Sequence, residues 1–177
     1  MKNYLFLLLF VCLTVSQSFA QNSKGYIGVS LGLASPMGDT ADGVDSGLEL
    51  GLINAGYRFN EKWGMTLNWG ASGHQLTEDD DITAGIGYIG IGPMYSYKGF
   101  DFKAQYAFVT AVIEDSFNDT TEDFDADSGF ILGVSYNYPL SDKWGLIGNA
   151  DYLTFTMEDA DESDSIFKLS VGIRYNF

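Results

Sequence analysis

The thirteen residues Ser165 to Phe177, SIFKLSVGIRYNF, constrain the fold of this chain more than any other stretch. Successive side chains of a β-strand point to opposite faces, so an alternating pattern assigns each residue to a face. One face is apolar and consists of Phe167, Leu169, Val171, Ile173, Tyr175 and Phe177. The other consists of Ile166, Lys168, Ser170, Gly172, Arg174 and Asn176. A strand of this kind either packs in a soluble sandwich or faces lipid in a transmembrane barrel.

Residues 1–20 are predicted to be a cleaved signal peptide. Lys2 supplies the positive charge, Leu5 to Val15 the apolar segment, and Ser18-Phe19-Ala20 a cleavage site of small-x-small type. An uncleaved membrane anchor is the alternative, but the apolar run is too short for a spanning helix. We therefore expect residues 21–177 to form one mature domain.

Cysteine content and charge narrow the chemistry of the mature chain. The single cysteine, Cys12, lies in the leader, and the residues before it lack the small residue of a lipoprotein signal. We therefore expect neither disulfides nor thiol chemistry. Without Lys2 the chain has 8 Lys and Arg against 24 Asp and Glu, a net charge of −16. This balance excludes nucleic acid as an expected partner and favours attraction of cations.

Turn residues divide the mature chain into eight strand-like runs. They are Lys24–Ala34, Gly47–Phe59, Trp63–His74, Ile82–Tyr97, Phe100–Ile113, Ser128–Leu140, Trp144–Met157 and Ser165–Phe177. Pro36 and Gly38 are expected to end the first run. The alternation changes phase near Gly51 and again between Gly90 and Pro93, which predicts a β-bulge at each place.

The connections between these runs alternate between long and short. The short ones, 60–62, 98–99 and 141–143, would lie at one end together with both termini, and the long ones at the other. Each run has about 11 to 16 residues, enough to cross an outer membrane at a tilt, and aromatic residues gather beside the short turns. The sequence thus predicts an all-β protein, an eight-stranded antiparallel up-and-down transmembrane β-barrel, rather than a soluble lipocalin-like barrel.

With its leader, eight runs and terminal VGIRYNF, the chain resembles the small bacterial outer-membrane barrels of the OmpA and OmpX type. The resemblance implies a Gram-negative outer membrane with periplasmic termini, extracellular acidic loops, and lipid and lipopolysaccharide as partners. Ile173, Tyr175 and Phe177 are similar to the signal that the barrel-assembly machinery recognises in its clients. No peptidoglycan-binding domain is expected after the barrel, so anchoring to the cell wall is not implied.

Acidic residues are concentrated in the four long connections, which hold 19 of the 24. Oxygen-rich segments suit Ca²⁺ or Mg²⁺, which could bridge to anionic lipopolysaccharide. The candidate ligands are Asp79, Asp80, Asp81, Asp123, Asp125 and Asp127. The alternative is a solvated, self-repelling surface, and no loop has the spacing of an EF-hand. No other cofactor is expected.

The barrel interior is the second candidate site. An eight-stranded barrel is just wide enough to be filled by side chains. Arg58, Lys103, Lys168 and Arg174 are expected to meet Glu49, Asp101 and Asp151 there, because an unpaired buried charge is costly. Such a network would be a structural plug or the lining of a narrow gated pore.

The favoured function is a structural or surface-interaction role, which means envelope integrity, adhesion or binding through the acidic outer loops. The protein is expected to be a monomer. A small cation-favouring pore is the alternative. An outer-membrane enzyme is the third hypothesis, resting on His74 and on Ser72 of the same strand face. Because no other group converges on this pair, we do not expect an enzyme.

Overall fold

The computed structural model describes residues 24–38, 43–76, 79–115, 120–157 and 163–177. Within these ranges, the side chains of residues 79–81, 114–115, 120–127 and 157 are not described. The predicted signal peptide, residues 1–20, lies outside the described part. No helix in the described part is long and apolar enough to cross a membrane.

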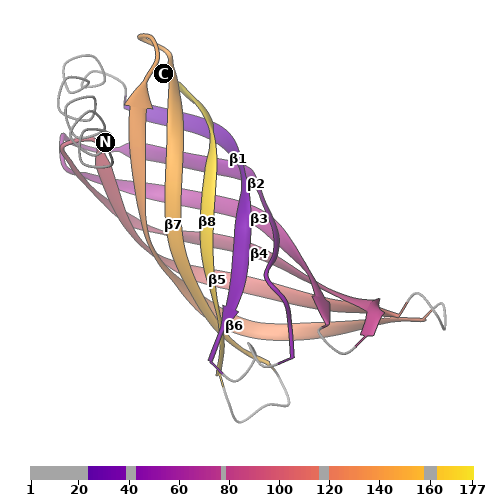
Figure 1. Cartoon of the computed structure of the whole chain (residues 1–177). Helices are drawn as coiled ribbons and strands as arrows, with labels where there is room; N and C mark the ends of the chain where they lie inside the picture. Colours follow the sequence, from indigo (N-terminus) through magenta and orange to yellow (C-terminus); the bar gives the residue numbers. More distant parts are fainter. Residues whose placement is uncertain (1–23, 39–42, 77–78, 116–119, 158–162) are drawn as a thin grey trace, which may run out of the picture.

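Eight strands form one closed antiparallel barrel (Figure 1). They are β1 (Gly25–Met37), β2 (Gly47–Arg58), β3 (Trp63–Leu76), β4 (Asp79–Tyr97), β5 (Phe100–Asp115), β6 (Thr120–Pro139), β7 (Trp144–Met157) and β8 (Ser163–Asn176). Each strand pairs with its neighbours in sequence, and β1 pairs with β8 to close the barrel. The predicted eight-stranded up-and-down barrel is confirmed.

The alternation of the sequence separates the two faces of the barrel wall. On β8, Val171 points outward with 72 % of its surface exposed, whereas Arg174 points inward and is 2 % exposed. The same division holds on β1, where Ile27, Val29 and Leu31 are exposed and Ser30 is buried. The exposed face of the wall is apolar, whereas charged side chains of the wall such as Lys168 and Arg174 point inward. This is the inverse of a soluble protein and the arrangement of a lipid-embedded barrel.

The bulge predicted near Gly51 is present in β2. Gly28 stands opposite Asn54 and Ser30 opposite Gly51, so Val29 alone faces the two residues Leu52 and Ile53. The pairing of β2 with β3 shifts at the same place. The extra residue lets the apolar residues on both sides of it face lipid, which explains the phase change in the sequence.

The predictions that rested on proline were wrong. Around Pro93, β4 keeps one register with both neighbours, and its pairing with β5 is only interrupted between Ile91 and Met94. Because proline has no backbone N–H, hydrogen bonds between β4 and β5 are lost here, but no extra residue is inserted into the strand. Pro36 does not end β1 either. It pairs with Ile166 of β8 beyond the point where pairing with β2 ends, an edge position that tolerates proline.

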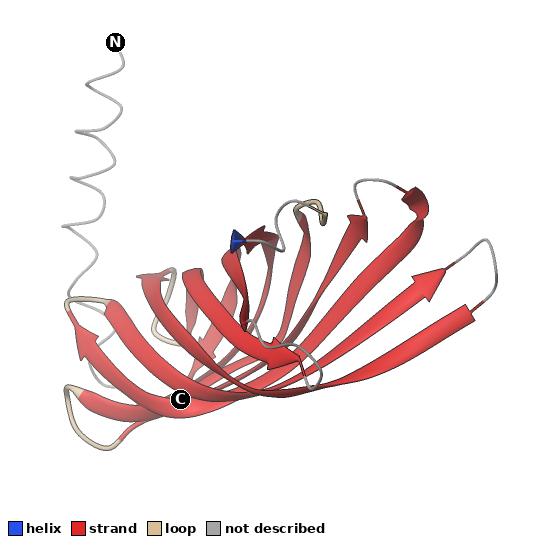
Figure 2. Cartoon of the chain, turned by 90° about the horizontal axis from the view of Figure 1, so that it is seen from below, coloured by secondary structure: helices blue, strands red, loops and turns tan. Residues whose placement is uncertain are grey.

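Two segments predicted to be acidic loops are strands. β4 begins at Asp79, and β6 begins at Thr120 and continues through residues 122–125 in pairing with β5. Continued pairing satisfies the backbone N–H and C=O groups of both strands. The hydropathy of the side chains does not reveal such pairing. The β5–β6 hairpin therefore reaches far beyond its neighbours (right of Figure 1), and strands make up nearly all of the described chain (Figure 2).

The opposite end has short turns and aromatic pairs. Lys98 and Gly99 have φ values of 50° and 85°, as a two-residue hairpin turn requires. The ring centroids of Trp63 and Tyr95 are 5.0 Å apart. The start of β1 meets the last residue of the chain here, since Gly25 and Phe177 exchange backbone hydrogen bonds of 3.0 and 2.9 Å (C in Figure 1).

Candidate functional site in the barrel interior

The end of the interior near the short turns holds a cluster of two arginines on one carboxylate. Arg58 Nη2 donates to both oxygens of Asp101, at 3.0 and 3.2 Å, and Arg174 Nη1 donates to Asp101 Oδ2 at 3.3 Å. Ser96 Oγ donates to Asp101 Oδ1 at 2.6 Å, and the Arg174 guanidinium lies 4.4 Å from the centre of the Tyr26 ring. The carboxylate is thus held by three donors from β2, β4 and β8.

A second ion pair joins β5 to β7 over the inner face of β6. Lys103 Nζ lies 3.0 Å from Asp151 Oδ2, and both side chains are buried. Gly133 on β6 leaves the room for this pair, because a Cβ there would lie 1.9 Å from Asp151 Oδ1. The glycine is therefore required by the close approach of the two charged side chains.

The third charged group combines Glu49, Lys168 and Tyr88. Lys168 Nζ lies 3.8 Å from Glu49 Oε1 and 3.2 Å from the centre of the Tyr88 ring. The Tyr88 hydroxyl donates a short hydrogen bond to Glu49 Oε1. The carboxylate and the face of the aromatic ring therefore both stabilise the ammonium group.

Neutral polar side chains form a hydrogen-bonded chain across five strands, which we call the polar belt. Ser135 Oγ donates to Asn149 at 2.7 Å, and Asn149 Nδ2 donates to Ser170 at 3.0 Å. Ser170 and Asn54 both donate to Ser30 Oγ, at 3.3 and 3.1 Å. The polar belt thus joins β6, β7, β8, β1 and β2, and its Ser30–Ser170 bond crosses the seam between the first and last strands.

Asn68 on β3 lies beside the belt and reaches the Lys103–Asp151 pair. With its amide turned to satisfy both ends, its oxygen accepts from Lys103 Nζ at 3.0 Å. The belt, the ion pairs and Asn68 leave the interior near the short turns crowded with buried polar groups.

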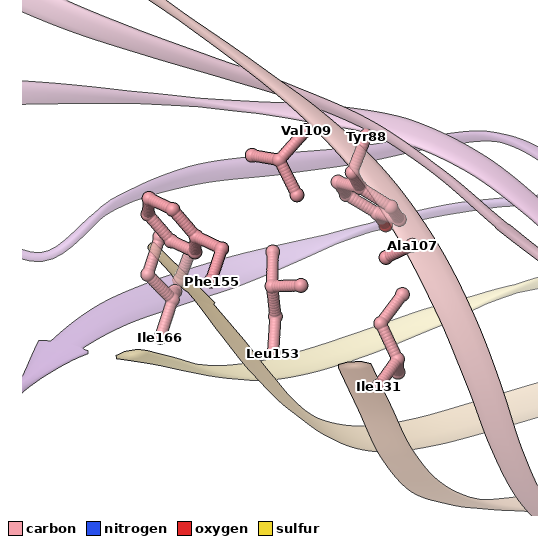
Figure 3. Packing of buried hydrophobic residues seen from close by; sticks show 8 residues of the cluster. Tyr88, Ala107, Val109, Ile131, Leu153, Phe155 and Ile166 are labelled. Carbon is pink, nitrogen blue, oxygen red and sulfur yellow. The ribbon is translucent and has the colours of Figure 1, made fainter. Parts of the chain in front are cut away.

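An apolar cluster fills the interior toward the long hairpins, which was not predicted (Figure 3). It consists of Ala34, Tyr88, Ala107, Val109, Ile131, Leu153, Phe155 and Ile166. Along β7 the inward-facing residues change from Asn149 and Asp151 to Leu153 and Phe155. The signal was present in the sequence, because Ile166 occupies the same strand face as Lys168.

Of the predicted site residues, the interior ones converge and the acidic ones lie elsewhere. Arg58, Lys103, Lys168 and Arg174 all meet carboxylates, with Glu49 and Asp151 among them. Asp79, Asp80 and Asp81 lie at the start of β4, and Asp123, Asp125 and Asp127 in β6; their side chains are outside the described part. Among described side chains, no group of three or more His, Cys, Asp or Glu could hold a metal ion.

Ser72 and His74 form a buried pair near the long-hairpin end. His74 Nδ1 lies 3.0 Å from the carbonyl oxygen of Asp45, and Nε2 lies 2.9 Å from Ser72 Oγ. Because a carbonyl only accepts, Nδ1 carries a proton and donates it to the Asp45 carbonyl, while Nε2 and Ser72 Oγ share the second hydrogen bond. The two side chains are 1 % and 5 % exposed, so neither is open to a substrate in this conformation.

The predicted assembly residues lie on the lipid-facing side at the end of the chain. Ile173 and Phe177 are 48 % and 64 % exposed. Tyr175 packs edge-on against Trp144, with ring centroids 5.1 Å apart. All three are thus placed on the outer surface beside the β6–β7 turn.

A closed eight-stranded antiparallel barrel with an apolar outside and a polar, charge-paired inside defines the class of transmembrane β-barrels. Residues 5–177 match the family described as "Outer membrane protein beta-barrel domain", and the chain belongs to this family. It is therefore a protein of the bacterial outer membrane.

Solved structures share this fold at low sequence identity. Neisserial surface protein A (NspA) matches with a TM-score of 0.63 and 16 % identity, over 86 % of this chain and 97 % of that one. The outer membrane protein OprG from Pseudomonas aeruginosa matches with a TM-score of 0.56 and 13 % identity, over 89 % of this chain and 97 % of that one. A major outer membrane protein from Thermus thermophilus matches with a TM-score of 0.55 and 16 % identity, over 86 % of this chain and 99 % of that one. No curated protein matches the sequence.

Proposed function

We propose that the protein is a non-conducting, monomeric outer-membrane barrel with a structural or surface-interaction role. In that role it supports envelope integrity, or mediates adhesion or binding through its acid-rich hairpins. The single observation that carries the proposal is the filled interior. An ion entering from the long hairpins would meet the apolar cluster first, and then the ion pairs and the polar belt.

The energetics of the interior support a closed barrel. Breaking a buried ion pair costs about 3–5 kcal/mol, because the remaining charge is left without a partner. Opening a water-filled path would separate several such pairs and also hydrate Leu153, Phe155 and Ile166. A small cation-favouring pore, the alternative function, would need this rearrangement.

The surface role rests on the shape and charge of the long-hairpin end. β5 and β6 continue their pairing well past the apolar cluster and carry acidic residues into these extensions. Asp79, Asp80, Asp81, Asp123, Asp125 and Asp127 are proposed to attract Ca²⁺ or Mg²⁺, which would bridge to phosphate groups of lipopolysaccharide. The hairpins would then act as a cation-dependent contact surface.

We propose no catalytic role for Ser72 and His74. The pair supports the wall locally, because His74 joins β3 to the segment before β2 through the Asp45 carbonyl. An enzyme would require that a substrate reach Ser72 Oγ, which is buried. Hydrolysis or acyl transfer that disappears in His74→Ala would revive that third hypothesis.

Single-channel conductance of the refolded mature chain in a planar bilayer tests the proposal. We expect no current steps with or without millimolar Ca²⁺ from a sample whose folding is verified by heat-modifiable migration on a gel. The double variant Leu153→Ala/Phe155→Ala, which hollows out the apolar cluster, is expected to give intermittent current. Discrete steps from the wild type that Ca²⁺ blocks would overturn the closed barrel and establish the cation-favouring pore.

A further inference from the structure

The lipid-facing surface of the barrel is interrupted by an apolar groove of about 520 Å³. Its floor is formed by the small residues Gly148 and Ala150 of β7. Leu169 and Val171 of β8, with Leu31 and Leu33 of β1 beyond them, line one side, and Phe100 and Tyr136 of β5 and β6 line the other. This volume is within the range of about 300–1,000 Å³ that is common for small-molecule sites.

An internal comparison shows that the groove is particular to β7. The short turns before β3 and β7 are built alike, since Trp63 N and Trp144 N each donate to a turn side chain, Asn60 or Ser141. Counted from these tryptophans, the outward positions of β7 hold Gly148 and Ala150 where those of β3 hold Leu67 and Trp69. At these two matched positions β3 therefore covers the wall with large side chains, whereas β7 has only a hydrogen atom and a methyl group.

Exposed lysines lie at the short-turn end of the same strands. Lys98 precedes Phe100 of the groove wall by two residues. Lys143 precedes Gly148 by five residues, which is about 17 Å along an extended strand. An amphiphile with its chain in the groove would therefore have its head group at the level of these two ammonium groups.

We propose that the groove binds one anionic glycerophospholipid. An acyl chain lies on Gly148 and Ala150, between the leucines of β1 and the rings of Phe100 and Tyr136. The negative head group lies at Lys98 and Lys143, which are drawn to it by charge. The occupant is a lipid because the groove opens onto the apolar, bilayer-facing surface. It is anionic because Lys98 and Lys143 together outweigh the exposed carboxylate of Asp142 beside them.

Native mass spectrometry of the whole mature protein tests this proposal. The protein is released from bilayers of phosphatidylglycerol and phosphatidylcholine, mixed equally and with identical acyl chains. We expect one phosphatidylglycerol retained per monomer. Gly148→Leu/Ala150→Trp fills the groove with the residues that β3 carries, and should lower retention at least about tenfold. Gly148→Leu alone is the milder variant, and a Cβ at this position meets no atom within 4 Å.

The head-group part has its own variant and matched control. Lys98→Gln/Lys143→Gln should abolish the preference for phosphatidylglycerol over phosphatidylcholine. Lys62→Gln removes an exposed charge from the β2–β3 turn, whose strands do not line the groove, and should leave the preference intact. The proposal is overturned by a wild type that retains no lipid, by equal retention of both lipids, by a groove-filled variant that retains lipid normally, or by a lipid-free dimer.

Discussion

Asp101 is the residue on which the interior depends most. Its buried carboxylate accepts from Arg58, Arg174 and Ser96, and no other carboxylate in the described part pairs with these two arginines. Asp101→Asn keeps the shape but leaves two guanidinium groups without a negative partner. We expect the free energy of unfolding to fall by about 3–5 kcal/mol, measured by urea titration in lipid vesicles.

Asp142→Asn is the matched control, because Asp142 lies exposed in the β6–β7 turn. It should change stability by no more than about 0.5 kcal/mol. Equal effects of the two substitutions would show that the arginine cluster contributes no more to stability than a surface charge.

At the same scale, the sequence predicts which residues face the interior but not which of them pair. The alternation of side chains between the two faces of a strand is enough to place Lys103, Lys168 and Asp151 inside the barrel. Asp151 and Lys168 are even direct partners in the β7–β8 register, yet Asp151 binds Lys103 and Lys168 binds Glu49. The stagger of the strands around the barrel decides these partners, and a single strand carries no record of that stagger.

At the scale of elements, the β1–β8 seam depends on glycines that face the interior. A Cβ on Gly172 would lie 1.9 Å from the Val29 carbonyl oxygen. Gly172→Ala should therefore move the two strands apart and cost about 1–3 kcal/mol. Gly148→Ala, whose Cβ meets no atom within 4 Å, should refold like the wild type. The folded fraction on a gel compares the two, and an unchanged yield for Gly172→Ala would refute the argument.

The elements themselves were predicted well wherever an apolar face had to meet lipid. The β2 bulge is an example, since the phase change at Leu52 is visible in the residues. The extensions of β5 and β6 were not predicted, because residues 120–127 have no apolar face and their strand character comes from pairing with the partner strand. The apolar cluster was missed for a different reason: a polar lumen was assumed along the full length of each strand.

At the scale of the whole molecule, the two ends differ in charge and length. The short-turn end carries Lys24, Lys62, Lys98 and Lys143, whereas the long hairpins carry most of the acids. The short turns of outer-membrane barrels face the periplasm and the long connections face the outside. We expect this orientation here, with both termini in the periplasm.

Cysteine labelling in intact cells tests the orientation, because the chain after residue 20 contains no cysteine of its own. Thr121→Cys lies in the β5–β6 hairpin and Ser141→Cys in the β6–β7 turn. A large polyethylene-glycol maleimide cannot cross the outer membrane, so it should modify only the cysteine at 121 until the membrane is permeabilised. Modification of the cysteine at 141 alone would mean that the acidic hairpins face the periplasm. The cation-bridged contact with lipopolysaccharide would then fail, whereas the lipid groove on β7 would remain.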